Sequence, residues 1–424
     1  MKAVCYPAVL SGTVAAIPSK SDAHRKLICA ALSVNGGTLP LHAPFCDDIA
    51  ATIRCLRALG AEITETENGL KISPLQRQAH ADLDCGESGS TLRFLLPVAM
   101  AVCNDISVTG QGRLPERPID TLTDAMSAHG VQFDAVHLPL SAHGSLNGGA
   151  FEIAGNISSQ FLSGLLMALP LCDSDSTITL TTALQSSKYV EMTLRTLREF
   201  GAEINVECVN GSYCYKIKKS QKLTFPNKIS IDGDWSNAAF WLTAGAISDK
   251  SEISVTGLNQ YSVQGDRQIA VILSHSGTAI TYSGTNCTVS CGTMPNFDVS
   301  MEEIPDLLPI LAVRAACGSG ETHFTNAARL RLKESDRLTA TAALLCGIGG
   351  TVKECPDGLC VAGGQLCGGT VDAQNDHRLV MAAAIAATRC AAPVTILGAE
   401  AVSKSYPAFF EDYRHLGGKV VFLD

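Results

Sequence analysis

The segment Leu59-Gly60-Ala61-Glu62-Ile63 reveals how the chain is organised, because it recurs in altered form five more times. In each copy an apolar, helix-like segment ends in a glycine and runs directly into an extended segment. A glycine there suits the left-handed backbone conformation that closes a helix. The glycines lie 68 to 76 residues apart, at Gly60, Gly130, Gly201, Gly277, Gly349 and Gly417. The chain is therefore predicted to use one unit of about 70 residues six times.

Each unit is predicted to hold two helices, of which the second ends at the glycine. The first helix lies upstream and is more apolar. Six such first helices are expected, over residues 21–32, 91–102, 159–171, 234–247, 303–316 and 376–388. Short alternating or β-branched runs, such as residues 70–73, lie between and after the helices and indicate strands. The sequence of elements in one unit is predicted to be βαβαββ.

The two ends of the chain are predicted to meet in one domain. The sixth unit is one strand short, and the N-terminal segment 2–6 is a strand without a place in the first unit. The most loop-like stretch between the third and fourth units is residues 218–227. We therefore expect two α/β domains of three units each, residues 14–227 and residues 1–13 plus 228–424. A six-unit solenoid is the alternative, although these repeats are longer than typical solenoid units.

Composition excludes several classes of protein. The 424 residues are 46% hydrophobic and 17% charged, which is enough for large cores and unlike a disordered chain. The formal net charge of −9 argues against nucleic acid or an anionic membrane as partner. The longest apolar run, residues 94–103, is about half a membrane span.

The 17 cysteines include no Cys-x-x-Cys pair, and the N-terminus has no secretory signal. Both features indicate reduced thiols and a cytoplasmic protein. The closely spaced Cys287 and Cys291 have no histidine at zinc-site spacing, so we expect no metal.

Cations gather where helices are predicted to begin. A helix N-terminus carries unpaired N–H groups and a partial positive charge, so it attracts anions and disfavours cations. A lysine or arginine there costs stability unless an anionic ligand is expected. Seven cations fit this pattern: Lys20, Arg25, Arg117, Lys333, Arg337, Arg378 and Lys404. If the repeats surround a pseudo-threefold axis, these helix starts line one face of each domain.

Each of these motifs has an ordinary structural explanation when it is taken alone. A serine or aspartate at a helix start is usually a cap, and a single arginine is usually solvated or ion-paired. The Gly86–Gly89 turn before a helix is weak evidence for phosphate binding. The joint occurrence of cations at equivalent positions in several repeats is what favours an anion site.

At these residues the chain resembles the enolpyruvyl transferase family, and within it the enzymes that act on shikimate 3-phosphate. The resemblance covers essentially the whole length. Its six most specific pieces, in the family's order, are Pro18-Ser19-Lys20-Ser21 with Arg25, Gly89-Ser90-Thr91-Leu92-Arg93, Glu116-Arg117-Pro118-Ile119, Ser158-Ser159-Gln160-Phe161, Lys333-Glu334-Ser335-Asp336-Arg337 and Asn375-Asp376-His377-Arg378. The resemblance implies an inside-out α/β barrel: two domains, each of three βαβαββ units about a pseudo-threefold axis, hinged between open and closed states.

The resemblance also implies a reaction. Shikimate 3-phosphate and phosphoenolpyruvate would give the enolpyruvyl ether and phosphate through a tetrahedral adduct, without a cofactor, metal or covalent enzyme intermediate. The catalytic residues would be Asp306 as proton acceptor, Glu334 as proton donor, and Lys20. The partners would be these two small molecules, and the protein would be a monomer.

The ligand-binding residues follow from the family's positions. Shikimate 3-phosphate is expected to contact Lys20, Ser21, Arg25, Ser158, Ser159, Gln160, Ser186, Tyr189, Asp306 and Lys333. Phosphoenolpyruvate is expected to contact Lys20, Gly89, Arg117, Gln160, Arg337, Arg378 and Lys404. Arginine's planar fork suits carboxylates and phosphates, whereas lysine acts as a mobile point charge. The small Gly89 leaves room for backbone to approach the enol.

Two residues depart from the family's pattern, and two alternative functions remain. Glu87 stands where many relatives have asparagine, and Arg329 falls where some relatives use asparagine, so Arg329 is left out of the site.

The first alternative is the enolpyruvyl transferase that acts on a UDP-sugar. That family carries a cysteine on a mobile loop near the arginine matched by Arg117, and residues 110–116 contain none. The second alternative is a non-catalytic scaffold that binds anions, which explains Asp306 and Glu334 poorly.

Overall fold

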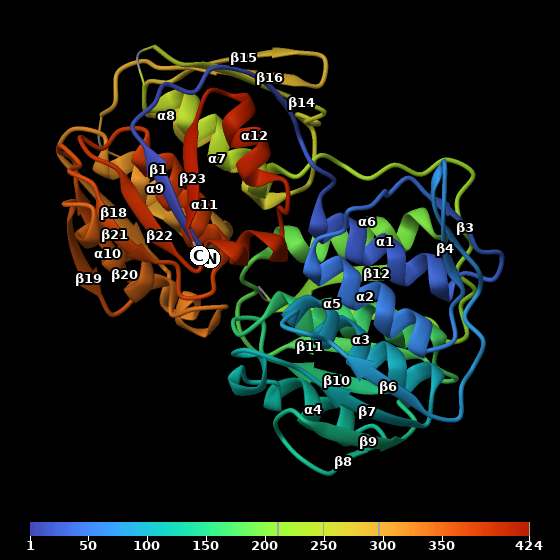
Figure 1. Cartoon of the computed structure of the whole chain (residues 1–424). Helices are drawn as coiled ribbons and strands as arrows, with labels where there is room; N and C mark the ends of the chain where they lie inside the picture. The colour runs from blue at the N-terminus through green and yellow to red at the C-terminus, as the bar shows by residue number, and fades with distance from the viewer. Residues whose placement is uncertain (210–211, 249, 296, 424) are drawn as a thin grey trace. The chain divides into compact units, whose positions relative to one another are not determined.

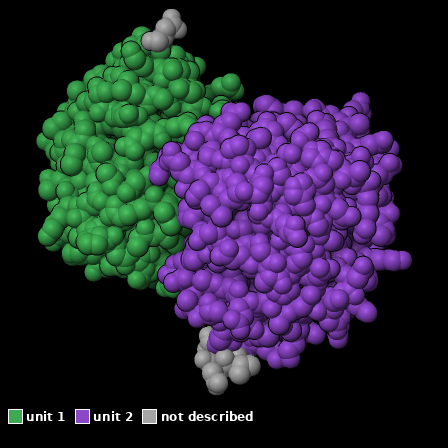
Figure 2. All heavy atoms as spheres, turned by 90° about the horizontal axis from the view of Figure 1, so that it is seen from below, with its two compact units in different colours: residues 1–19, 232–424 green, residues 20–231 purple. Residues whose placement is uncertain are grey.

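The computed structural model describes residues 1–209, 212–248, 250–295 and 297–423, and Asp424, the last residue of the second predicted domain, lies outside this range. The chain divides into two compact units, coloured separately in Figure 2. The N-terminal unit is residues 20–231, and the C-terminal unit is residues 1–19 with 232–424. Each unit has its own hydrophobic core. The domain boundaries expected from the sequence stay a prediction.

The N-terminal unit contains three repeats (Figure 1). The first is α1 (Lys20–Leu32), β3 (Gly37–Leu39), α2 (Asp47–Ala58), β4 (Ile63–Thr66) and β5 (Gly69–Ile72). The second is β6 (Ala81–Asp84), α3 (Gly89–Val102), β7 (Asp105–Thr109), the short 3-10 turn η1 (Leu114–Glu116), α4 (Asp120–Ser127), β8 (Val131–Phe133) and β9 (Leu140–Gly144). The third is β10 (Ala150–Ile153), α5 (Ser159–Ala168), η2 (Leu169–Leu171), β11 (Ser176–Leu180), α6 (Ser187–Glu199), β12 (Ile204–Val209) and β13 (Ser212–Ile217).

The C-terminal unit contains the other three. The fourth repeat is β2 (Gly12–Ala15), α7 (Trp235–Ala246), β14 (Glu252–Thr256), η3 (Gly265–Arg267), α8 (Gln268–His275), β15 (Ala279–Ser283) and β16 (Asn286–Ser290). The fifth is β17 (Val299–Ser300), η4 (Pro305–Leu307), α9 (Leu308–Ala316), β18 (Glu321–Thr325), η5 (Ala328–Leu332), α10 (Arg337–Gly347), β19 (Thr351–Cys355) and β20 (Gly358–Ala362). The sixth is β21 (Gly369–Asp372), α11 (His377–Ala387), β22 (Val394–Leu397), η6 (Ala399–Lys404), α12 (Phe409–His415), β23 (Lys419–Leu423) and β1 (Lys2–Tyr6).

Every four-stranded sheet follows one rule of strand order. Within a repeat the order is first, second, fourth, third, as in β6-β7-β9-β8 and β17-β18-β20-β19. The first two strands are parallel and the others are antiparallel. In the sixth repeat the fourth place is taken by β1, which pairs with both β22 and β23. The expectation that the N-terminal strand completes the last unit is confirmed.

The first repeat has only the three strands β3-β5-β4 among the described residues. The strand β2, which precedes α1 in the chain, pairs instead with β14 in the fourth repeat. The connection between α1 and β3 contacts the segment that follows the third repeat, since Val34 N donates to Leu223 O at 2.9 Å. The sequence did not predict this exchange, because β2 follows directly on β1 and precedes α1.

The first helix of each repeat lies inside its unit, behind the sheets. Every residue of α7 and of α11 is buried, which explains why these helices are apolar on all sides. Helices α7, α9 and α11 pack against one another, as do α3 and α5. The second helices, such as α6, bury one face only. No helix in the described part of the chain is both long and apolar enough to cross a membrane.

The six glycines adopt the backbone conformation that the sequence predicts. Their φ angles are 97°, 100°, 83°, 84°, 84° and 99° in chain order. Each lies just past the end of a second helix, where a left-handed residue closes the last turn. In every repeat the C-terminal end of the second helix therefore lies next to the following strand, and its N-terminal end lies at the opposite end of the helix.

Candidate active site

In the N-terminal unit the predicted residues gather where α1, α3, α5 and α6 begin. Lys20 is the first residue of α1, and its Nζ lies 2.6 Å from Oδ2 of Asp48 at the start of α2. Gly89 opens α3 directly after its N-cap Ser88. Ser158 caps α5, and Ser186 precedes α6. These starts meet because the repeats place equivalent helix ends on one side of the unit.

Arg25 holds two of these helices together. Its guanidinium donates to Ser21 O at 2.6 Å, to Tyr189 O at 2.8 Å and to Thr193 Oγ1 at 2.7 Å. Burial lowers the pKa of Arg25 to about 10, and the group still remains charged near neutral pH. The structure thus brings Arg25, Ser21 and Tyr189 together, as three residues of one predicted ligand set.

A second group surrounds Gly89. A methyl group added at Gly89 would lie 2.6 Å from Nη1 of Arg117 and 3.0 Å from Nη1 of Arg93. Arg93 Nη1 donates to Gln160 Oε1 at 2.8 Å, and Gln160 Nε2 donates to Ser90 Oγ at 2.9 Å. Two guanidinium groups and an amide therefore lie beside the first turn of α3, where the helix dipole also favours an anion.

Arg93 and Asp48 were not assigned a role from the sequence. Arg93 belongs to the same motif as Gly89 and follows it by four residues, so one turn of helix places both on one face. That spacing was the signal that could have found it. Asp48 could not be found this way, because its contact with Lys20 joins two helices whose register the sequence does not show.

In the C-terminal unit the predicted residues form one network around Asp306 of η4. Asp306 Oδ1 lies 2.8 Å from Arg337 Nη1 and 3.7 Å from Lys333 Nζ. Its other oxygen lies 2.9 Å from Arg378 Nη2. Burial alone would raise the pKa of Asp306, but Arg378, Lys333 and Arg337 hold it well below its usual range. Asp306 is therefore an ionised carboxylate with three cations around it.

Arg337 is the most enclosed of these cations, with its side chain 1% exposed. Besides Asp306 it contacts Glu334 Oε2 at 2.6 Å and Asp376 Oδ2 at 3.0 Å. Burial lowers the pKa of Arg337, but the carboxylates of Asp376, Glu334 and Asp306 outweigh burial and raise it. Asp376 was quoted from the sequence only as part of a motif. It also caps α11, since its side chain accepts from Arg378 N.

Lys333 differs from the arginines because its charge depends on pH near neutrality. Burial lowers its pKa to about 8, although Asp306 and Glu334 act in the opposite direction. Lys404 lies at the end of η6, and its Nζ donates to Asn375 O at 2.7 Å, directly before α11. All six of the residues predicted for this unit, Asp306, Lys333, Glu334, Arg337, Arg378 and Lys404, therefore surround the starts of α9, α10 and α11.

The prediction that these seven cations stand in the first turn of a helix is wrong for four residues. Arg25 is the sixth residue of α1, in its second turn, and the other three lie outside the α-helices. Arg117 follows η1 in an extended conformation, and α4 begins only at Asp120. A residue before proline is disfavoured in the helical region, and Pro118 follows Arg117. Lys333 is likewise extended and precedes α10, and Lys404 lies before α12. These side chains approach neighbouring helix starts from a preceding loop.

The two residues noted as departures lie at the edges of these groups. The carboxylate of Glu87 packs on Gly112, where an added methyl group would lie 2.4 Å from Glu87 Oε2. Arg329 donates to the carbonyl of Glu302. Neither contact joins the groups around Gly89 or Asp306.

Comparisons with known proteins agree with one another. A family model described as EPSP synthase (3-phosphoshikimate 1-carboxyvinyltransferase) matches residues 5–413. The 3-phosphoshikimate 1-carboxyvinyltransferase of Clostridium acetobutylicum is 42% identical over 98% of this chain and 97% of that protein. The enzyme of the same name from Clostridium perfringens is 39% identical over 98% of both chains.

Solved structures show the same fold. The EPSP synthase from Acinetobacter baumannii superposes with a TM-score of 0.80 at 25% identity, covering 99% of this chain and 100% of that one. An enolpyruvyl transferase from Streptomyces tendae superposes with a TM-score of 0.77 at 17% identity, covering 99% and 98%. At that identity the second likeness concerns the fold alone.

Proposed function

The chain belongs to the EPSP synthase family, and from this premise we propose which of its residues carry the reaction. As a member of the family it is a transferase of the shikimate pathway. It moves the enolpyruvyl group of phosphoenolpyruvate to the 5-hydroxyl of shikimate 3-phosphate and releases phosphate. The substrates are therefore small anions that together carry two phosphates and two carboxylates.

The chemistry makes three demands on the protein. A base must take the proton of the attacking hydroxyl, an acid must protonate the methylene carbon of the enol, and cations must hold the anionic groups while phosphate leaves the tetrahedral adduct. No step requires electrons from outside, because the addition and the elimination are both acid–base steps.

The observation that carries the proposal is the position of Asp306 among Arg337, Arg378 and Lys333. The three cations keep this carboxylate ionised, as a base must be, and an anionic substrate that contacts the same cations arrives within reach of it. Glu334 is bound to Arg337, so the same guanidinium connects the proposed base and the proposed acid. We assign Asp306 to the hydroxyl proton and Glu334 to the methylene carbon, with Lys20 as the third catalytic residue.

For shikimate 3-phosphate, the proposed contacts fall into two sets. The N-terminal unit supplies Lys20, Ser21, Arg25, Ser158, Ser159, Gln160, Ser186 and Tyr189, and the C-terminal unit supplies Asp306 and Lys333. Support comes from the links already described, since Arg25 joins Ser21 to Tyr189 and both lie at helix starts. A phosphate there meets a guanidinium and unpaired N–H groups together.

For phosphoenolpyruvate, the N-terminal unit supplies Lys20, Gly89, Arg117 and Gln160, and the C-terminal unit supplies Arg337, Arg378 and Lys404. The support in the N-terminal unit is the absence of a side chain at Gly89 where Arg117 and Arg93 approach it. We add Arg93 to this group as the residue that orients Gln160.

A substitution of Asp306 tests this assignment. Asp306→Asn keeps the size of the side chain and leaves its three cations available to anions, so both substrates should still bind. The turnover number should fall by about 10²- to 10⁴-fold, the usual contribution of a positioned base. Steady-state kinetics with each substrate varied separately would separate the turnover number from the Michaelis constants.

The matched control is Arg331→Ala, which breaks a neighbouring ion-pair network with Asp336 and Glu354 outside the proposed contacts. This variant should keep its turnover number within a few-fold. Near-normal turnover in Asp306→Asn would remove Asp306 as the base, even if the overall reaction is as proposed.

We also propose that the protein acts as a monomer in the cytoplasm and without nucleic acid. The net charge of −9 supports the last point, because phosphate backbones repel such a surface. Light scattering on the purified protein checks the oligomeric state directly.

A further inference from the structure

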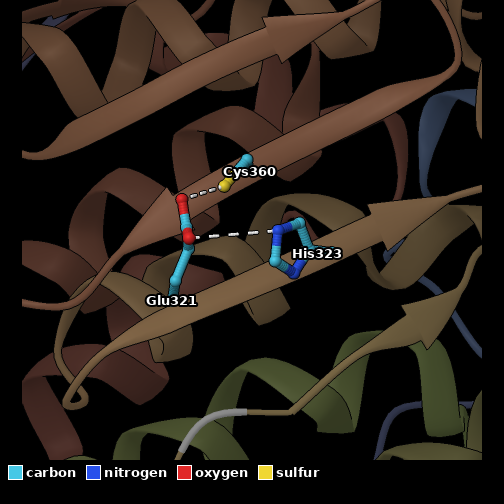
Figure 3. Close-up of side chains that lie close together, drawn as sticks. All are labelled: Glu321, His323 and Cys360. Atoms are coloured by element: carbon cyan, nitrogen blue, oxygen red, sulfur yellow. Dashed lines mark hydrogen bonds and ion pairs between the residues drawn. The ribbon is translucent and has the colours of Figure 1, made fainter.

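Three side chains with metal-binding atoms meet on the outer face of the fifth sheet, β17-β18-β20-β19. Glu321 and His323 are two residues apart on β18, so they point to the same face. Cys360 lies on β20 directly opposite His323 in the antiparallel register. One ligand atom from each of the three lies within 4.8 Å of the others. Figure 3 shows the carboxylate of Glu321 lying close to both the thiol and the imidazole.

The contacts within this group hold three potential metal ligands close together. The Cys360 thiol donates to Glu321 Oε1 at 2.6 Å, and His323 Nε2 lies 4.0 Å from Glu321 Oε2. On the far side of the ring, Asp298 Oδ1 lies 3.0 Å from His323 Nδ1 and also accepts from the His323 backbone N–H. Because the Asp298 carboxylate can only accept, Nδ1 is the donor nitrogen, and Nε2 is the ring nitrogen that faces Glu321 and is placed to bind a metal ion.

A carboxylate behind a histidine is the arrangement that orients imidazole ligands in metal sites. The contact of Asp298 supports a metal site independently of the three potential ligands, because Asp298 selects the tautomer of His323 and orients its ring. Exposed carboxylates alone would favour no particular ion, whereas a thiol with an imidazole selects for a borderline-soft cation.

We propose that Cys360, His323 and Glu321 bind one Zn²⁺ ion, with water as the fourth ligand. Thiolate, imidazole and carboxylate are the three ligand types that zinc takes in proteins, and three protein ligands with water complete a tetrahedron. Binding of the ion displaces the Cys360 thiol proton, which now makes the hydrogen bond to Glu321, and that proton leaves to solvent. The thiolate and the carboxylate together balance the two positive charges of the ion.

The proposed ion would connect β18 to β20 through side chains. It would bind only the folded sheet, because His323 and Cys360 are neighbours through strand register and not through sequence. This is also why spacing rules applied to the sequence gave no metal. None of the three ligands belongs to the residues proposed for catalysis, so zinc should change stability and leave enolpyruvyl transfer unchanged.

Cobalt titration of the full-length protein tests the proposal. The reduced protein is freed of metal with a chelator, dialysed, and titrated with Co²⁺, whose bond to a thiolate gives an intense near-ultraviolet charge-transfer band. We expect one Co²⁺ per chain with this band, loss of the band when Zn²⁺ is added, and a higher melting temperature with Zn²⁺. Asp298→Asn should keep the band and weaken affinity by about 10- to 100-fold, the usual cost of losing a partner behind a ligand.

Cys360→Ser should lose the band and the gain in melting temperature. The matched control is Cys346→Ser, which removes an exposed cysteine of the same unit and should retain both the band and the gain in melting temperature. A wild-type protein without the thiolate band would overturn the proposal. So would a band that survives in Cys360→Ser or disappears in Cys346→Ser.

Discussion

At the residue scale, the cations of the C-terminal unit are positioned by carboxylates before any substrate arrives. Arg337 is held by Asp306, Glu334 and Asp376 at 2.6 to 3.0 Å. Such fixed charges need little reorganisation when charge develops during the reaction, which is the usual origin of electrostatic catalysis. The carboxylates also limit the cost of burying arginine, because an unpaired buried charge is strongly destabilising.

Gly89→Ala should weaken phosphoenolpyruvate binding more than shikimate 3-phosphate binding. The new methyl group would lie 2.6 Å from Arg117 Nη1, so the guanidinium must move away from its position. Losing one charge-assisted hydrogen bond costs about 1.5–3 kcal/mol, which corresponds to about a tenfold or larger rise in the Michaelis constant. Steady-state kinetics with each substrate varied measures the two effects.

The control for Gly89→Ala is Gly364→Ala, because nothing lies within 4 Å of a methyl group at that position. It should leave both Michaelis constants unchanged. An equal rise for both substrates in Gly89→Ala would count against placing phosphoenolpyruvate at this helix start.

The activity should fall as the pH rises through about 8. Lys333 is charged below its pKa and neutral above it, and burial lowers that pKa to about 8. If the ammonium group binds shikimate 3-phosphate, kcat/KM for this substrate decreases on the alkaline side, since that ratio reports the free enzyme. Lys333→Arg keeps its charge and should move the alkaline limb to higher pH. An unchanged limb in this variant would assign the titration to another group.

At the scale of elements, the N-terminal ends of the helices serve the site, and the C-terminal ends serve the fold. The starts hold caps in equivalent places, such as Ser88 on α3, Asp234 on α7 and Asp376 on α11. A buried hydrogen-bonded chain also joins three helices of the N-terminal unit, from His24 through Thr52 to Thr91. The ends hold the left-handed glycines, so substitutions there should affect folding and leave the anion groups intact.

Two of these glycines make a matched pair for a stability test. At Gly201 an added methyl group meets nothing within 4 Å, so Gly201→Ala costs only the left-handed backbone strain, about 1–2 kcal/mol. At Gly60 the same methyl group lies 2.1 Å from the carbonyl oxygen of Gln76, so Gly60→Ala should destabilise more. Urea unfolding monitored by circular dichroism compares them. Equal losses would show that the contact with Gln76 relaxes without cost.

At the scale of the whole molecule, the repeat made most of the fold predictable. Spacing of glycines and apolar helices gave six units and placed the N-terminal strand in the last sheet, where β1 pairs with β22 and β23. The pairing of β2 with β14 could not be predicted, because the sequence of a short strand between β1 and α1 does not identify the strand it pairs with.

The residues of the candidate site were also only partly predictable from the sequence. Residues in motifs, such as Arg25 and Asp306, could be named from the sequence, and the structure brings each into contact with other named residues of its own unit. Their roles with substrate remain predictions. Contacts that depend on packing between helices, such as Lys20 with Asp48, could not be named, because sequence patterns fix periodicity within an element and not register between elements.

The reaction is tested most directly by phosphate release from phosphoenolpyruvate, measured with shikimate 3-phosphate and separately with UDP-N-acetylglucosamine. We expect rapid release with shikimate 3-phosphate and none above background with the sugar nucleotide. No release with shikimate 3-phosphate, or faster release with the sugar nucleotide, would contradict this expectation.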